Sequence, residues 1–70
     1  MKRKAMIKKL QLEAKRRGRE FEIKELTRHT AIRIGTEAHT LGRHNEFDET
    51  TVRQFFAQYQ SELGKGWWRK

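Results

Sequence analysis

The chain has 70 residues, which is enough for one small domain. Its 17 Lys and Arg residues outnumber its 9 Asp and Glu residues, and the net charge of +8 at pH 7 favours a polyanionic partner. The absence of cysteine excludes disulfides and thiolate metal sites, and no apolar run is long enough to span a membrane. With no signal-peptide pattern either, we expect a cytoplasmic protein that does not bind a membrane.

A helix is predicted over residues 2–17. Its apolar residues recur at spacings that place them on one helical face, namely Met6, Ile7, Leu10 and Ala14. Gly18 follows Arg17, at the position where a glycine commonly ends a helix. We therefore expect the apolar face of this helix to pack against the rest of the domain.

Three antiparallel strands are predicted after this helix. Residues 19–26 alternate between apolar and charged side chains, which predicts a strand with Phe21 and Ile23 on its half-buried face. Residues 27–35 form the second predicted strand, with the intervening turn at residues 25–27. Gly35 and Thr36 form a plausible tight turn into a weaker third strand over residues 37–41. Such short connections indicate an antiparallel meander.

The last predicted element is one uninterrupted helix over residues 49–63. Asp48 is the expected N-cap residue, and Gly64 is expected to end the helix. One apolar stripe follows the helix and consists of Val52, Phe55, Phe56, Tyr59 and Leu63. The element order is therefore α-β-β-β-α, an α+β fold with a three-stranded antiparallel sheet and two helices packed on one face.

We assign residues 1–64 to a single domain and residues 65–70 to a C-terminal tail. Trp67 and Trp68 in this tail have three alternative roles: packing on the domain, stacking on a base, or anchoring a partner. Packing on the domain is the preferred interpretation.

The second strand, within the stretch TRHTAIRIG, raises the question of function. Ile32 and Ile34 alternate with His29 and Arg33, so the basic pair is expected on the open face of the sheet. Lys24 of the first strand is expected on the same face. From spacing alone a solvated surface is the preferred interpretation, and a site that handles phosphate chemistry is the alternative.

Histidine side chains can transfer protons near neutral pH, and the chain has three, His29, His39 and His44. Metal-independent RNA cleavage needs a base for the 2′-hydroxyl proton, an acid for the leaving 5′-oxygen, and cations near the phosphate. His29 beside basic residues supplies those parts, whereas His39 is more typical of a structural or exposed residue. The histidine spacing matches no zinc motif, so we expect no metal and no cofactor.

His44 follows Arg43 in the segment before the last helix. The two residues either orient a phosphate or simply make hydrogen bonds within their loop. Charge alone also leaves the partner open, because an anionic membrane surface or an acidic protein attracts this chain as nucleic acid does.

Three segments of the chain match the pattern of one known family. MKRKAMIKKL followed by RRGREFEI is similar to a basic first helix, a glycine and a first strand, and RHTAIRIG is similar to a histidine-bearing second strand. GRHNEFDETTVRQF matches a passage that leads into the second helix, at Arg43, His44, Glu46, Phe47, Asp48, Thr51 and Arg53. In these segments the chain resembles the small HicA-type toxins of bacterial toxin–antitoxin modules, which are mRNA interferases.

The resemblance implies a double-stranded-RNA-binding-domain-like fold and a metal-independent endoribonuclease that cleaves mRNA. It also implies that His29 is the catalytic histidine and that a cognate HicB-type antitoxin inhibits the protein. The candidate RNA-binding residues are Arg28, Arg33, Lys24, Arg43 and His44. The chain departs from the family at Thr27 and Arg28, which replace small residues before the histidine, and at Gly42, which replaces a proline.

With this resemblance, catalysis becomes the preferred interpretation of His29. The main alternative is a non-catalytic RNA- or DNA-binding module of the same fold, which needs no histidine at that position. A further alternative is a protein-interaction domain whose basic face binds an acidic protein.

Overall fold

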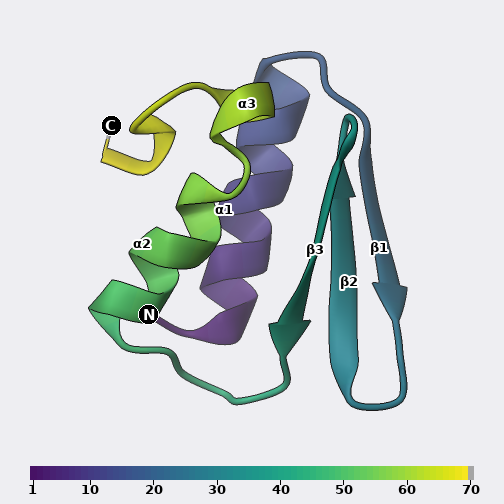
Figure 1. The fold of residues 1–70 in the computed structure, drawn as a ribbon, viewed down its shortest axis with the longest axis vertical. Helices are drawn as coiled ribbons and strands as arrows, with labels where there is room; N and C mark the ends of the chain where they lie inside the picture. The colour runs from purple at the N-terminus through teal and green to yellow at the C-terminus, as the bar shows by residue number, and fades with distance from the viewer. Residues whose placement is uncertain (70) are drawn as a thin grey trace.

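The computed structural model describes residues 1–69 and shows an α+β fold with a three-stranded antiparallel sheet (Figure 1). Its elements are α1 (Arg3–Arg16), β1 (Phe21–Glu25), β2 (His29–Ile34), β3 (Glu37–Gly42), α2 (Glu49–Ala57), α3 (Gln60–Leu63) and a 3₁₀ turn, η1 (Trp67–Arg69). The strand order is β1-β2-β3, so the predicted meander is confirmed. The helices lie on one side of the sheet, and the other face is left open (Figure 1).

The apolar face of α1 forms one wall of the core. Met6, Leu10 and Ala14 are fully buried, as their spacing predicted. The helix ends where Gly18 adopts a positive φ of 69°. The amide of Arg19 then donates to the carbonyl of Ala14, and the amide of Gly18 donates to the carbonyl of Lys15. These two bonds form the Schellman motif that a glycine at this position favours.

Strand β2 is the central strand and shows the predicted alternation. Thr30, Ile32 and Ile34 are buried against the helices, whereas His29 is exposed on the open face. The turn before β2 lies one residue later than predicted, at residues 26–28 instead of 25–27. The amide of Leu26 donates to the carbonyl of His29, which closes a two-residue hairpin loop.

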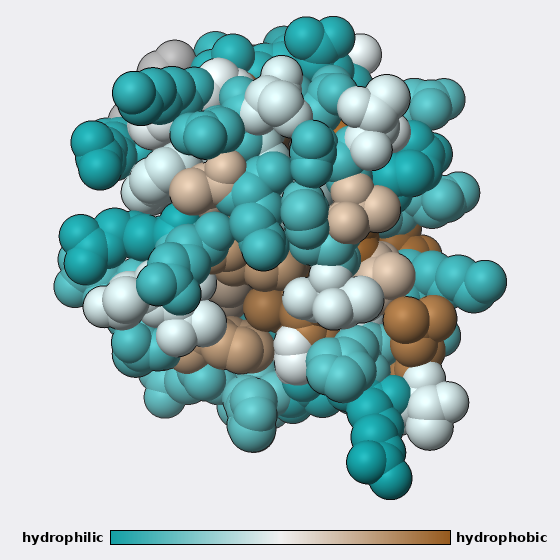
Figure 2. Space-filling model, viewed as in Figure 1, coloured by the Kyte–Doolittle hydropathy of each residue, from teal (hydrophilic) through white to brown (hydrophobic). Residues whose placement is uncertain are grey.

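Strand β1 is less buried than its alternating sequence predicted. Ile23 is paired with Ile32 and faces the helix layer, yet 43% of its surface is exposed. Leu26, just beyond the strand, is 39% exposed. Apolar surface is visible on the side where Figure 1 places β1 (Figure 2). The helices therefore cover β2 and leave much of β1 uncovered.

The predicted single C-terminal helix is wrong, because it is interrupted between α2 and α3 at Gln58 and Tyr59. The amides of these two residues bond to carbonyls three residues earlier, those of Phe55 and Phe56. The predicted apolar stripe is nevertheless buried throughout, and the Tyr59 hydroxyl donates to the Ile32 carbonyl at 2.8 Å. Burial raises the pKa of the Tyr59 hydroxyl, which remains a neutral donor.

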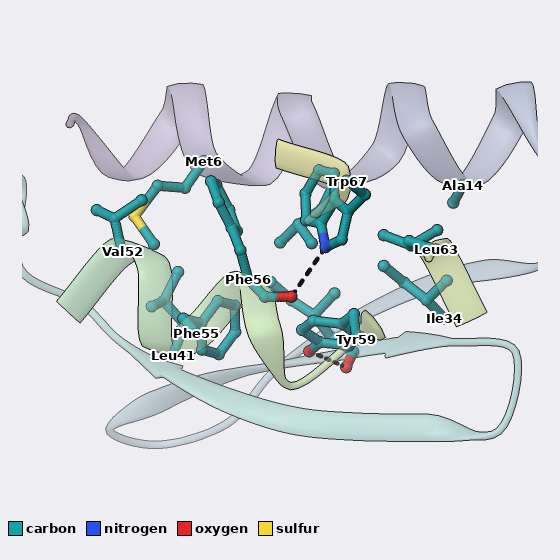
Figure 3. Close-up of a cluster of buried hydrophobic side chains, with 12 residues drawn as sticks. Met6, Ala14, Ile34, Leu41, Val52, Phe55, Phe56, Tyr59, Leu63 and Trp67 are labelled. Atoms are coloured by element: carbon teal, nitrogen blue, oxygen red, sulfur yellow. Dashed lines mark hydrogen bonds between the residues drawn. The ribbon is translucent and has the colours of Figure 1, made fainter. Parts of the chain in front are cut away.

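Residues 65–69 pack back on the helices, as the preferred interpretation of the tryptophans predicted. Trp67 is 2% exposed and lies in the core, and its indole Nε1 donates to the Phe56 carbonyl at 2.9 Å (Figure 3). Trp68 is partly buried against the same core. Trp67 is therefore a core residue and cannot serve as an exposed anchor for a partner.

Candidate active site around His29

One end of the sheet gathers most of the candidate residues. The β1–β2 turn, the end of β3 and the loop to α2 all lie at this end, at the bottom of Figure 1. His29 begins β2 and is paired with Gly42, the last residue of β3. Because His29 is exposed and in opposite phase to the buried Thr30, its side chain is presented on the open face.

The ring of His44 lies close to Gly42, the residue that is paired with His29. A β-carbon at Gly42 would lie 3.5 Å from Cδ2 of His44. Directly opposite residues in an antiparallel pair project to the same face, with β-carbons about 4.5–5.5 Å apart. The imidazole of His44 therefore lies near the place where a side chain at residue 42 would stand beside that of His29. Because Gly42 has no side chain, nothing from that position separates the two histidines.

The loop that carries His44 is held by the N-terminal residues. Backbone hydrogen bonds join the amide of Arg3 to the Asn45 carbonyl and the amide of Phe47 to the Met1 carbonyl, both at 2.9 Å. The ring of Phe47 packs on the core and makes an edge contact with the His44 ring, at a centroid distance of 6.0 Å. These contacts restrict the position of His44 more than a free loop would.

A charged network lies behind His29, on the helix-facing side of the sheet. The fully buried Thr30 donates from Oγ1 to the Glu25 carboxylate at 2.8 Å and accepts from the Arg3 guanidinium. Arg43 pairs with the same carboxylate at 3.0 Å, and Arg3 lies 3.7 Å from it. The bond from Thr30, with the charges of Arg43 and Arg3, lowers the pKa of Glu25. This network joins the ends of all three strands to α1.

No functional role was predicted for Arg3, Glu25 or Thr30. Only Thr30 carried a signal, because a polar residue in phase with Ile32 and Ile34 is expected to be buried and hydrogen-bonded. The other two come from distant parts of the chain and meet only in the folded structure.

Two of the predicted phosphate-binding cations are already paired with protein groups. Arg33 lies 3.3 Å from the Glu22 carboxylate and 3.6 Å from that of Glu20, and it donates to the Gly35 carbonyl at 2.6 Å. Arg43 pairs with Glu25 and also donates to the Leu26 carbonyl. A phosphate that binds either guanidinium has to compete with these partners.

Arg28 and Lys24 are more accessible cations. Arg28 is exposed in the turn immediately before His29, and Lys24 is exposed on the open face, paired with Ala31. Lys24 is a diagonal neighbour of His29, for which the spacing is about 7–8 Å. Within residues 1–69, neither side chain makes a hydrogen bond or an ion pair. Arg28 and Lys24 are therefore the candidate cations that are free to meet a phosphate near His29.

His39 lies apart from this cluster, on the helix-facing side of β3. Its Nε2 is 2.9 Å from the Glu37 carboxylate, and its ring contacts Tyr59 edge-on at a centroid distance of 5.0 Å. Of the two alternatives for this histidine, structural or merely exposed, these contacts favour the structural one. In the part of the chain that the structure describes, no group of three or more His, Cys, Asp or Glu side chains is placed to hold a metal ion.

No helix in residues 1–69 combines the length and the apolar character needed to cross a bilayer. Comparisons of the chain with protein-family models, with curated proteins and with solved structures gave no match. The assignment of function therefore depends on the geometry around His29 and on the resemblance of the sequence segments.

Proposed function

We propose that this protein is an endoribonuclease of the HicA type that cleaves mRNA, with a double-stranded-RNA-binding-domain-like fold and His29 as its catalytic histidine. The observation that carries the proposal is that two histidines meet at Gly42: His29 is paired with this residue, and the ring of His44 lies close to it. The surrounding charge supports it, because a chain with net charge +8 attracts RNA.

The proposed reaction is attack by the ribose 2′-hydroxyl on the adjacent phosphate. One histidine accepts the 2′-hydroxyl proton, and the new oxygen–phosphorus bond displaces the 5′-oxygen, which takes a proton from the other histidine. The products are a 2′,3′-cyclic phosphate and a free 5′-hydroxyl. Arg28, an exposed cation next to His29 in the chain, would stabilise the charge that develops on the phosphate oxygens.

A substrate without the attacking group tests this chemistry directly. The purified protein should cleave an RNA oligonucleotide in the presence of EDTA and leave a cyclic phosphate end, which mass spectrometry identifies. The same oligonucleotide with 2′-deoxyribose at the cleaved position should resist, because it has no 2′-hydroxyl there. Binding without cleavage would favour the non-catalytic module, and loss of cleavage in EDTA would contradict the mechanism.

Salt dependence separates the accessible cation from the paired one. Arg28→Ala should reduce the slope of log affinity against log salt by about 0.7, the value for one lost contact to a single-stranded phosphate. Arg33→Ala should change the slope less, because Glu20 and Glu22 already neutralise that guanidinium. Fluorescence anisotropy of a labelled RNA over a salt series measures both slopes. A larger change for Arg33→Ala would mean that RNA displaces the two carboxylates.

A toxin of this kind needs an inhibitor in the cell that makes it, so the proposed partners are mRNA and a cognate HicB-type antitoxin in the cytoplasm. An acidic antitoxin that covers the open face around His29 would block access of RNA and would be attracted by the net positive charge.

A further inference from the structure

Strand β1 ends the sheet on one side. The strand order is β1-β2-β3, and among residues 1–69 no backbone pairs with the outer side of β1 (Figure 1). Its sequence, FEIKE, has a feature that matters for such an edge. The charges of Glu22 and Lys24 are opposite and lie symmetrically about Ile23. An edge strand with this pattern is complementary to an antiparallel copy of itself.

The hydrogen-bonding pattern between β1 and β2 shows which backbone amides and carbonyls of β1 are free to bond an added strand. Gly35 donates to the Glu20 carbonyl and Leu26 donates to the His29 carbonyl, so even-numbered residues of β1 bond to β2. By the alternation of an antiparallel ladder, the amides and carbonyls of Phe21, Ile23 and Glu25 point outward. These are the groups that an added strand would bond.

We propose that a second copy of this chain pairs with β1, antiparallel and two-fold symmetric, with Ile23 opposite Ile23 of the second copy. In this register the outward groups of Phe21 and Glu25 also face each other, so every outward amide of β1 finds a carbonyl. On the open face Glu22 lies opposite Lys24 of the second copy, and the converse pair forms by symmetry. Opposite charges at directly opposed positions stabilise a strand pair.

The neighbouring symmetric registers that keep this hydrogen-bonding phase are unfavourable. A shift in one direction places Glu22 opposite Glu22 of the second copy, and a shift in the other direction places Lys24 opposite Lys24. Like charges directly opposite each other destabilise a strand pair. Among the side chains of β1 itself, the register with Ile23 opposite Ile23 is therefore the one of the three that contains no like-charge pair.

The helix layer does not cover the edge strand completely, which such a pairing requires. A two-fold axis perpendicular to the sheet puts the helices of both copies on the same side, where they would collide if they covered β1 completely. The helices do not cover β1 completely, since Ile23 is 43% exposed on that side. Pairing would bury this apolar surface against its symmetric equivalent. The open faces of the two copies would then form one continuous surface. This proposal does not depend on whether the protein cleaves RNA.

The strand pair is a small interface, so we expect a weak dimer whose population rises with protein concentration. The two copies repel each other through their net charge of +8, and salt screens this repulsion, so the measurement belongs at physiological ionic strength. Sedimentation velocity over a concentration series gives the dissociation constant. A chain that stays monomeric at millimolar concentration would overturn the proposal.

Charge reversal tests the register. Glu22→Lys and Lys24→Glu should each weaken the dimer about tenfold or more, because each creates two like-charge pairs. The two variants change the net charge in opposite directions, so a general electrostatic effect would weaken the dimer in one variant and strengthen it in the other. The double variant, with both residues exchanged, should restore dimerisation because the pairs become complementary again. Failure of the double variant to recover, with circular dichroism showing a folded chain, would overturn the register.

Amide hydrogen exchange locates the interface residue by residue. In the monomer the amides of Glu22 and Lys24 are protected by β2, and those of Phe21, Ile23 and Glu25 face solvent. Raising the concentration should slow exchange at the second set alone. A concentration-dependent slowing elsewhere, without change at Ile23, would mean that the copies associate through another surface.

Discussion

Substituting His29 with alanine should lower the rate of RNA cleavage by about 10²- to 10⁴-fold, which is typical for loss of a proton-transfer group. The fold should persist, because His29 is exposed and lies outside the core. The rate is measured on a purified RNA under single-turnover conditions, and circular dichroism checks the fold. Wild-type cleavage by His29→Ala would exclude this residue as the catalytic group.

His39 provides a matched control for the His29→Ala experiment. His39→Ala should cleave RNA at the wild-type rate, because His39 contacts Glu37 and Tyr59 on the other side of the sheet. His44→Ala decides whether the second imidazole takes part. If the two histidines act as one unit, the double variant with His29→Ala should be little slower than either single variant. An unaffected His44→Ala variant would assign the second proton transfer to water or to the substrate.

Trp67→Ala should reduce the free energy of unfolding by about 3–5 kcal/mol, the range for truncation of a buried aromatic side chain. Trp67 is 2% exposed, packs against Phe56 at a ring-centroid distance of 4.8 Å, and donates to its carbonyl. Small domains are stable by only about 5–15 kcal/mol, so the variant would lose much of its stability. Urea denaturation followed by far-ultraviolet circular dichroism measures the loss.

Trp68 provides the matched control for this experiment. It is only partly buried, at the edge of the same core, so Trp68→Ala should cost less than Trp67→Ala. The comparison holds the residue type and the position in the chain nearly constant and varies the burial. A Trp67→Ala variant within about 0.5 kcal/mol of wild type, as for an ordinary surface substitution, would mean that the segment after residue 64 does not contribute to the core.

Patterns that depend on local periodicity were predictable from the sequence. The buried face of α1, at Met6, Leu10 and Ala14, follows from the helical repeat. The exposure of His29 opposite the buried Thr30 follows from the two-residue repeat of a strand. The order of helices and strands follows from these repeats together with the glycines that separate them.

Hydrogen bonds between groups that are distant in the sequence were not predictable in the same way. The C-terminal helix is interrupted after α2, and there the Phe56 carbonyl accepts from the Tyr59 amide and from the indole of Trp67. In an uninterrupted α-helix the amide of Gln60 would bond to that carbonyl. A continuous apolar stripe gives no sign of this, because the indole comes from beyond the predicted end of the helix.

The candidate site divides in the same manner. The sequence by itself determined that His29 and Arg33 lie on the open face of a basic domain, because strand alternation and composition are local or additive properties. Only the tertiary structure decided that His44 lies close to Gly42, the strand partner of His29, that Arg33 and Arg43 are paired with carboxylates, and that Ile23 is exposed at the edge. Each of these depends on which segments the packed core brings together, and periodicity along one segment carries no information about its neighbours.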